Sequence, residues 1–237
     1  MSGISWANIH SRDQSWRAKL IGDLSSAYVI PRYVELFEKY FRKPGRFSFL
    51  ELGSGNGDLV RSIMDKKFDF IERYTVSECF PEGVAWLKEQ GLEAMLIDAE
   101  RIAFPDASFD VLLSFDVMHH VKDPARMGYE MLRTARGRLF LTESNGLSVG
   151  RKLKELTPAH RRAGEKSYTP GQYRSFFTHS GFKITHFEIY PLVFPIPLPR
   201  KMTAWLVAFN RWIENVPFLK WQCSNVAIYL EYERTKM

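Results

Sequence analysis

The chain is poor in cysteine, with only Cys79 and Cys223 among its 237 residues. So few cysteines exclude a disulfide framework, and their separation is not that of a cysteine metal site. Because this usage suits a reducing compartment, we expect a cytoplasmic protein. Long apolar runs are also missing: none approaches the roughly 18 residues of a membrane span. The opening segment, MSGISWANIHSRDQSW, lacks the apolar core of a secretory signal.

Basic charge is not concentrated along most of the chain. Lys and Arg number 33 against 27 Asp and Glu, which gives a net charge of +6, but the basic residues are scattered. They gather only between Arg151 and Lys166, where a solvated loop or helix face is the simpler interpretation. The charge pattern therefore argues against a nucleic-acid partner.

The remaining composition is that of a packed globular protein, with 45% hydrophobic and 25% charged residues. A chain of this length fits one α/β domain with additions. We therefore expect a single domain over 1–237. It would consist of an N-terminal helical cap (1–45), a regular core (46–145) and less regular segments with the last strands (146–237).

A glycine loop dominates the core, in the stretch FSFLELGSGNGD. The apolar run Phe47–Leu52 predicts a buried parallel strand, and a helix is expected from Asp58 to Asp65. Between them stand three glycines at alternate positions, namely Gly53, Gly55 and Gly57. Glycine permits the sharp turn and lets a ligand approach the bare backbone. A dinucleotide fingerprint, GxGxxG, would need a glycine at position 58, so the loop alone leaves the ligand open.

Acidic residues close the next two predicted strands, 73–78 and 93–98. Glu78 follows the glycines by about 20 residues, the spacing expected of an acid that binds ribose hydroxyls. Asp98 ends the following strand, and a fourth buried strand is predicted over 109–115. Acids at successive strand ends after a glycine loop are a more specific pattern than the loop alone.

This pattern resembles the class I S-adenosylmethionine-dependent methyltransferases, and most of all their small-molecule group of ubiquinone-type, sterol and natural-product enzymes. The resemblance rests on ExGxGxG at 51–57, the strand-end acids and FPDASFD at 104–110, and it covers 46–143 closely. It implies S-adenosylmethionine as the cofactor. The residues that it places at the cofactor are Glu51, Gly53, Ser54, Gly55 and Gly57 on the methionine side, Glu78 at the ribose, Asp98 and Ala99 at the adenine, and Phe115.

The whole chain then reads as a doubly wound, seven-stranded, mostly parallel sheet of Rossmann-like type. Later strands are predicted at 138–142, 182–190 and 226–232, the last of them antiparallel. Helices are expected at 33–41, 81–90, 125–133 and 170–180, while 144–169 is polar and basic. In methyltransferases of this type the segment before the core often caps the site, so Trp6, His10, Trp16 and Tyr28 would belong to a lid or simply pack on the sheet.

An insertion at 191–222 carries apolar residues along one face of a predicted helix near 200–216. Such a stripe is often core. It also fits the wall of an apolar acceptor pocket, a dimer contact or a membrane surface approached with Arg200, Lys201 and Arg211.

Three residues are candidates for catalysis: His119 and His120 after the fourth strand, and Glu143 at the end of the fifth. Some sugar O-methyltransferases resembling this chain carry a histidine pair and an acid at these places, which implies that the acid holds an imidazole ready to take a hydroxyl proton. The alternative is that His120 only supports the cofactor and begins the next helix. No metal is expected, since the acids end separate strands and the adjacent histidines point different ways.

We therefore expect methyl transfer to a small-molecule acceptor, most simply at oxygen of a natural-product, sugar or quinone-like compound, with Tyr168 lining its pocket. Ser114, Phe115, Asp116 and Val117 stand where enzymes for DNA bases and glutamine carry an Asn or Asp, two prolines and an aromatic. That departure argues against nucleic-acid methylation. Carbon or nitrogen methylation of a lipid-like acceptor at a membrane surface stays open, and so does a non-catalytic, cofactor-binding partner subunit.

Overall fold

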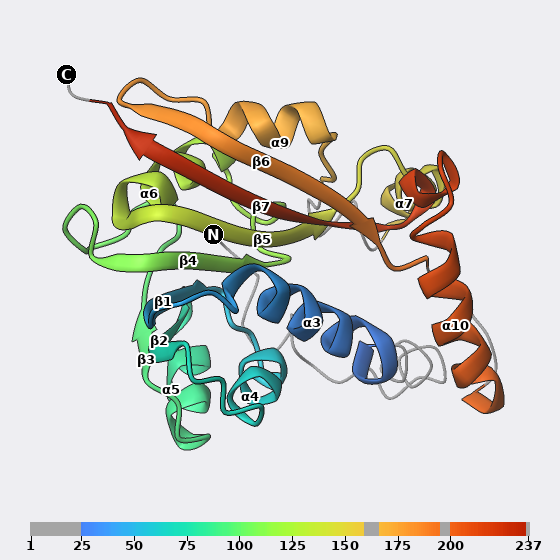
Figure 1. The fold of residues 1–237 in the computed structure, drawn as a ribbon, viewed down its shortest axis with the longest axis horizontal. Helices are drawn as coiled ribbons and strands as arrows, with labels where there is room; N and C mark the ends of the chain where they lie inside the picture. The colour runs from blue at the N-terminus through green and yellow to red at the C-terminus, as the bar shows by residue number, and fades with distance from the viewer. Residues whose placement is uncertain (1–24, 159–165, 195–199, 236–237) are drawn as a thin grey trace.

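The computed structural model describes residues 25–158, 166–194 and 200–235. These residues form one mixed sheet with helices on both of its faces (Figure 1). The strands are β1 (Phe47–Leu52), β2 (Ile71–Glu78), β3 (Ala94–Leu96), β4 (Phe109–Phe115), β5 (Ala135–Ser144), β6 (Phe182–Leu192) and β7 (Asn225–Arg234). The bounds of β1 and β4 are those predicted from their apolar runs.

The strand order is β3-β2-β1-β4-β5-β7-β6. The first five strands pair in parallel, and β7 lies antiparallel between β5 and β6. This confirms the predicted doubly wound, mostly parallel sheet. The chain direction across the sheet reverses between β1 and β4, and in open α/β sheets ligands bind beside the carboxyl ends of strands at such a point.

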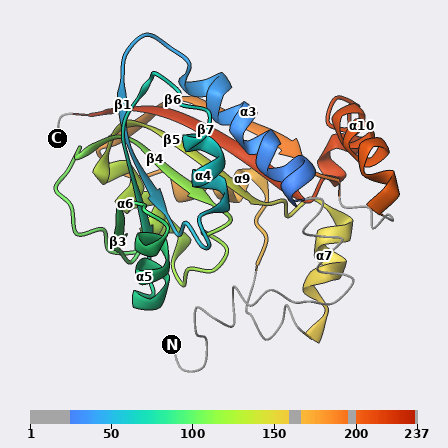
Figure 2. The same ribbon diagram turned by 90° about the horizontal axis from the view of Figure 1, so that it is seen from below.

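Helices form a layer on each side of the sheet. The described elements are η1 (Ser25–Val29), α3 (Ile30–Phe41), α4 (Asp58–Met64), α5 (Pro81–Glu89), α6 (Pro124–Thr134), α7 (Val149–Glu155), α9 (Pro170–Phe176), η2 (Arg200–Met202), α10 (Thr203–Ile213) and η3 (Leu219–Gln222). Buried residues of α3, α4 and α5 share one core, and those of α6 and α9 share the other. Figure 2 shows α7 and α10 beyond these layers, at one end of the molecule.

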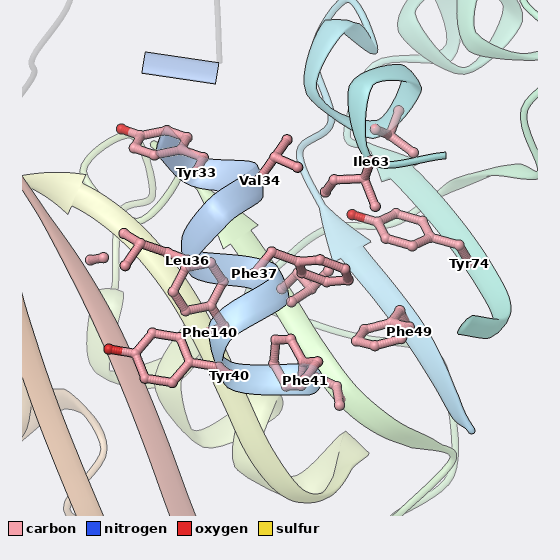
Figure 3. Packing of buried hydrophobic residues seen from close by; sticks show 14 of the residues in the cluster. Tyr33, Val34, Leu36, Phe37, Tyr40, Phe41, Phe49, Ile63, Tyr74 and Phe140 are labelled. Carbon is pink, nitrogen blue, oxygen red and sulfur yellow. The ribbon is translucent and has the colours of Figure 1, made fainter. Parts of the chain in front are cut away.

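The α3 core is built mainly from aromatic rings (Figure 3). Phe37 and Phe41 follow each other by one helical turn, so both rings face the sheet. Phe37 lies 5.2 Å from Phe49 of β1, and Tyr40 stacks on Tyr229 of β7 at 4.3 Å between ring centroids. The helix α3 thus packs against both β1 and β7, which are the first and last strands in the sequence.

Two predicted segments differ from the structure. The polar and basic stretch 144–169 contains a helix, α7, which was not expected because it has no buried residues and therefore no apolar periodicity. The helix expected at 170–180 ends at Phe176, although its Thr169 start is fixed by a capping box with Gln172. Of the residues expected in an N-terminal lid, Trp6, His10 and Trp16 lie outside the described residues, and Tyr28 is buried.

The insertion helix α10 does not bury its whole apolar stripe. Leu206 and Ile213 are buried, whereas Trp205 and Trp212 are 51% and 57% exposed. The stripe is wider than the face that the rest of the protein covers, so the tryptophans at its margin lie outside. Glu214 anchors the helix end, because its buried carboxylate accepts from Tyr28 and from Arg32 Nε at 3.0 Å. No helix in the described ranges is long and apolar enough to span a membrane.

Candidate functional site

The candidate residues gather at the carboxyl ends of the parallel strands. The glycine loop follows β1, Glu78 ends β2, and the two histidines follow β4 next to the end of β5. The loops after β1 and β4 touch, since a Cβ added to Gly53 would lie 2.6 Å from Val117 Cγ2. The sheet therefore places both groups of predicted site residues at one edge.

All three loop glycines have left-handed backbone angles, with φ of 66° at Gly53, 58° at Gly55 and 80° at Gly57. Side chains other than glycine rarely adopt this conformation. A Cβ at Gly57 would also lie 2.9 Å from Arg61 and 3.1 Å from Leu87. At Gly53 and Gly57, packing within the protein therefore requires a residue without a side chain, as the turn also does.

Glu51 is a buried acid at the end of β1, 2% exposed. Burial raises the pKa of its carboxyl to about 7, although hydrogen bonding from Tyr74 and proximity of the Ser54 hydroxyl oppose the rise. The Tyr74 hydroxyl donates to Glu51 Oε2, and the Ser54 hydroxyl makes no well-aligned hydrogen bond. Within the described part of the chain, no cationic side chain pairs with Glu51. A cationic ligand group would therefore favour its charged form.

Glu78 is tied directly to the glycine loop. Its Oε1 accepts from the Gly55 backbone N at 2.5 Å, and its Oε2 accepts from Cys79 N at 3.3 Å. Burial raises the pKa of the carboxyl, and these two backbone donors oppose the rise. The contact with Gly55 was not foreseen from the sequence, because it joins residues of different strand ends. Glu78 therefore fixes the loop, and each of its carboxylate oxygens can still accept a second hydrogen bond.

The residues predicted near the adenine lie farther along the same edge. Asp98 is exposed, and its Oδ1 accepts from Glu100 N at 2.9 Å in the turn after β3. Ala99 is 9% exposed beside it. Phe115, at the end of β4, is partly buried and stacks on Tyr33 at 5.9 Å. The carboxylate of Asp98 is thus accessible, while Phe115 belongs to an aromatic group on the α3 side.

His119 and Glu143 form a buried pair. His119 Nδ1 lies 2.8 Å from Glu143 Oε2, and the two residues are 7% and 0% exposed. Glu143 Oε1 accepts from the backbone N atoms of Val117 and Met118 at 3.0 and 2.6 Å. One carboxylate therefore fixes both the loop after β4 and the orientation of the imidazole.

The charge state of His119 is set by opposing effects. Burial alone would lower the pKa of the imidazole, but the charge of Glu143, its hydrogen bond and the charge of Asp116 outweigh burial and raise the pKa. With Nδ1–H donating to Glu143, the other ring nitrogen, Nε2, is the atom that can exchange a proton. His120 differs from its neighbour: it is exposed, and its ring centre lies 4.1 Å from that of His119.

A second polar group beside the pair was missed by sequence reasoning. Asp116 has a left-handed φ of 58° and lies between Tyr33 of α3 and Asn225 of β7. Asn225 Nδ2 donates to Asp116 Oδ1 at 3.2 Å and to the Tyr33 hydroxyl at 3.1 Å. Burial and the nearby charge of Glu143 raise the pKa of Asp116 to about 6. An acid directly after a buried strand was the signal available, but its partners are over 80 residues away.

Tyr168 approaches the same edge from the segment after α7. Its backbone oxygen accepts from Gly146 N at 2.9 Å, and a Cβ on Gly146 would lie 2.6 Å from the Tyr168 carbonyl carbon. Burial, and secondly the charge of Glu143, raise the pKa of the partly buried hydroxyl. Gly146 thus allows the chain to bring Tyr168 near the His119–Glu143 pair. No group of three or more metal-ligating side chains occurs in the residues that the structure describes.

Solved structures share this arrangement of strands and helices. The methyltransferase partner in a complex with an activator protein from Haloferax volcanii matches with a TM-score of 0.61 and 15% identity, over 90% of this chain and 93% of that one. A SAM-dependent methyltransferase from Archaeoglobus fulgidus matches at 0.60 and 14% identity, over 86% and 92%. The cyclase SpnF matches at 0.53 and 18% identity, over 87% and 81%. At such low identity the likeness shows the fold alone.

The fold and the strand-end site define the class I methyltransferase type. Residues 50–140 match the family model described as a methyltransferase domain, and a comparison with curated protein sequences gave no match. Residues 50–140 thus form a methyltransferase domain, and this domain and the fold support S-adenosylmethionine as the cofactor.

The residues present fit this cofactor. Its amino group is cationic, and Glu51 is an acid whose pKa is raised by burial, with no cationic side chain paired to it in the described ranges. The glycine loop after β1 keeps the backbone bare beside it, and Glu78 and Asp98 provide acceptors at the next two strand ends. These are the chemical groups that an amino acid, a ribose and an exocyclic amine require.

Proposed function

We propose that the protein transfers a methyl group to a hydroxyl oxygen of a small molecule, with His119 as the general base. The observation that carries the proposal is the buried His119–Glu143 pair, in which Nδ1 lies 2.8 Å from the carboxylate. An uncharged amine can attack the sulfonium methyl group without such a base. A hydroxyl, by contrast, must lose its proton to become a good nucleophile.

The cofactor residues follow from their places on the strand ends. We propose that Glu51 binds the amino group, that the backbone of the loop through Gly53, Ser54, Gly55 and Gly57 lies beside the methionine moiety, and that Glu78 accepts from the ribose hydroxyls. Asp98 accepts from the adenine amine, with Ala99 and Phe115 near the ring. When bound, S-adenosylmethionine supplies an electrophilic methyl group. The core 46–145 thus holds the cofactor, and the N-terminal cap and 146–237 shape the acceptor side.

The base and its partner have separate tasks in this proposal. His119 Nε2 takes the acceptor proton, and the imidazolium that forms is stabilised by Glu143, whose carboxylate lies in a buried site. Glu143 is a positioning residue, since both its oxygens already accept from His119, Val117 and Met118. Because only neutral imidazole can take a proton, turnover rises with pH through the pKa of His119, which lies above its ordinary value.

The acceptor is proposed to be partly apolar and to carry a hydroxyl. Tyr33 on α3 stacks on Phe115 at the end of β4, and burial and also the charge of nearby Glu143 raise the pKa of the Tyr33 and Tyr168 hydroxyls. Asp116 adds an acceptor of raised pKa that can receive a hydrogen bond from a second hydroxyl. A natural-product, sugar or quinone-like compound has this combination of ring surface and hydroxyl groups.

The proposal is tested by measuring homocysteine release with a panel of hydroxyl, amine and carbon acceptors. We expect turnover with hydroxyl acceptors and a loss of about 10² to 10⁴-fold for His119→Ala, with cofactor affinity kept. His186→Asn, an exposed histidine on β6, is the matched control.

Other outcomes separate the alternatives. Equal turnover of His119→Ala and the unchanged protein contradicts the base assignment, and a loss confined to His120→Asn moves the role to its neighbour. Methylation of amines only, or cofactor binding without turnover of any acceptor class, contradicts the O-methyltransferase proposal.

A further inference from the structure

Exposed apolar side chains gather in two segments of the protein. Residues 147–156 and 205–219 hold eight of the twelve large apolar side chains that are exposed in the described ranges. They include Leu153 and Leu156 on and after α7, Trp205 and Trp212 on α10, and Phe218 before η3. We call the exposed apolar side chains of these two segments the α7–α10 surface. Single exposed apolar residues are ordinary, but a gathering of this kind marks an interaction site.

The two segments lie side by side although about 50 residues separate them in the sequence. The hydroxyl of Ser148 donates to the Gln222 carbonyl at 2.9 Å, and Val149 N donates to Gln222 Oε1 at 3.1 Å. Figures 1 and 2 both place α7 and α10 at the same end of the molecule. The start of α7 is therefore joined to η3, and the exposed side chains of both segments lie at this end of the molecule.

Aromatic rings are presented outward on this surface. Trp205 stacks on Phe209 at 5.1 Å with an angle of 10°, and Phe209 lies 5.7 Å from Trp212. Phe218 is 87% exposed at a left-handed φ of 67°. A bulky residue held in this conformation is strained, and such strain is found where a side chain must be presented for function.

Charge on the same segments is almost wholly basic. Residues 147–156 and 200–222 contain seven Lys and Arg against two Glu. Of these charged residues, Lys152 pairs with Glu155 at 3.2 Å, Arg211 pairs with Glu35 of α3, and Glu214 is buried against Arg32. Lys152, Lys154 and Lys201 are exposed. An apolar, aromatic surface bordered by lysines is complementary to an anionic lipid surface and unfavourable for self-association.

We propose that the α7–α10 surface docks the protein on an anionic lipid bilayer. Trp205, Trp212 and Phe218 enter the interfacial layer, and the lysines lie at the level of the headgroups. The contact is peripheral, since it uses one face of a short helix and a turn. The surface adjoins the end of β5, so docking turns the acceptor side of the strand-end site towards the bilayer. The proposal holds for any acceptor and does not depend on oxygen methylation.

Vesicle sedimentation tests this proposal with the full-length protein. Vesicles of phosphatidylcholine alone are compared with vesicles that also contain phosphatidylglycerol, at low and high salt. We expect binding only to the anionic vesicles and release by salt, because headgroup attraction is screened. Lys154→Gln and Lys201→Gln should each weaken binding about fivefold, from about 1 kcal/mol per lysine.

The apolar contribution is tested by the double variant Trp212→Ser with Phe218→Ser. It should weaken vesicle binding about tenfold or more, since two rings no longer leave water. Met64→Ser, an exposed apolar residue on α4, is the matched control and should bind as the unchanged protein does. Titration with S-adenosylmethionine shows that each variant is folded, and its affinity should not change.

Three results would overturn the proposal. Equal binding to both kinds of vesicle contradicts the charge assignment, and equal binding of the double variant contradicts the aromatic one. A dimer in analytical ultracentrifugation that the double variant converts to a monomer, without vesicle binding, identifies the occupant as a second copy of the chain.

Discussion

The two halves of the strand-end edge are built in different ways. On the β1–β3 side, the candidate residues are held by contacts between the strand ends themselves, as in the contact between Glu78 and Gly55, which are 23 residues apart. On the β4–β5 side, they are held by partners from distant elements, as Asp116 is by Tyr33 and Asn225. The first side has the regular form of a shared cofactor site, and the second depends on how this particular chain folds back on itself.

This difference indicates which half of the site is specific to this protein. In the proposed assignment the β1–β3 side holds the cofactor, which every member of the class shares, so this half needs little more than a glycine loop and strand-end acids. The acceptor half is assembled from α3, the segment after α7 and the last strands. Changes in the second half should therefore affect stability and turnover together, and changes in the first should affect cofactor affinity.

The largest expected effect comes from Glu143→Ala. Removing this carboxylate leaves the backbone N–H groups of Val117 and Met118 without their buried acceptor and leaves His119 without its partner. We expect a loss of about 3 to 5 kcal/mol in the free energy of unfolding, measured by urea denaturation. Glu188→Ala, a half-exposed acid on β6, is the control. A loss equal to that of the control would contradict the anchoring role.

Glu78→Ala is the corresponding change on the cofactor side. It removes the acceptor proposed for the ribose and frees the Gly55 N–H. Affinity for S-adenosylmethionine should fall by about 1.5 to 3 kcal/mol, the value of a charge-assisted hydrogen bond, in calorimetric titration. Glu82→Ala, an exposed acid at the start of α5, should leave affinity unchanged. An unchanged dissociation constant for Glu78→Ala would refute the assignment.

Gly53→Ala tests the contact between the two halves, because Gly53 lies where the loops after β1 and β4 touch. Its left-handed φ and the approach of Val117 disfavour any side chain. We expect a loss of about 1 to 2 kcal/mol in stability from the backbone conformation, with weaker cofactor binding. Gly171→Ala, where nothing lies within 4 Å of the added Cβ, is the control for thermal unfolding. Equal unfolding temperatures for the two variants would show that the loop tolerates a side chain.

The effect of Glu51→Gln on stability is expected to have the opposite sign. The pKa of Glu51 is about 7 in the folded protein, above its ordinary 4.5, so the folded state binds the proton more tightly than the unfolded state. Stability due to this group is therefore lost as pH rises from about 4.5 to 7. Without cofactor, Glu51→Gln should be more stable than the unchanged protein at pH 8 by up to about 3 kcal/mol, and the difference should vanish below pH 4.5.

The same substitution should weaken cofactor binding, since a neutral amide cannot pair with the cationic amino group. Ser48→Ala, at the other end of β1, would serve as a control for changes in the strand. A Glu51→Gln protein that is less stable at pH 8 and binds the cofactor normally would contradict both the burial argument and the proposed contact.

The features that the sequence predicted are those that depend on local patterns and on the pairing of neighbouring strands. The bounds of β1 and β4 were predicted to the residue, because each is a short, mostly apolar run followed directly by a turn or an acid. The doubly wound, mostly parallel sheet and its antiparallel last strand, β7, were also predicted. The placement of His119 and Glu143 at neighbouring strand ends followed from the parallel pairing of β4 with β5.

Other features could not be read from the sequence, because they depend on long-range packing. The partners of Asp116 come from α3 and β7, and no local pattern links these segments. Similarly, the apolar stripe of α10 does not reveal how much of its width is covered, and the structure leaves Trp205 and Trp212 exposed. The helix α7 lacks buried residues and so has no periodic signal.

The most direct test of the division between the two halves is calorimetric titration of three proteins with S-adenosylmethionine, with NAD as the control ligand. The unchanged protein and His119→Ala should bind S-adenosylmethionine equally and should not bind NAD, and Glu78→Ala should bind about tenfold or more weakly. Weak binding by His119→Ala together with unchanged binding by Glu78→Ala would contradict the account, because it would place the cofactor on the β4–β5 side.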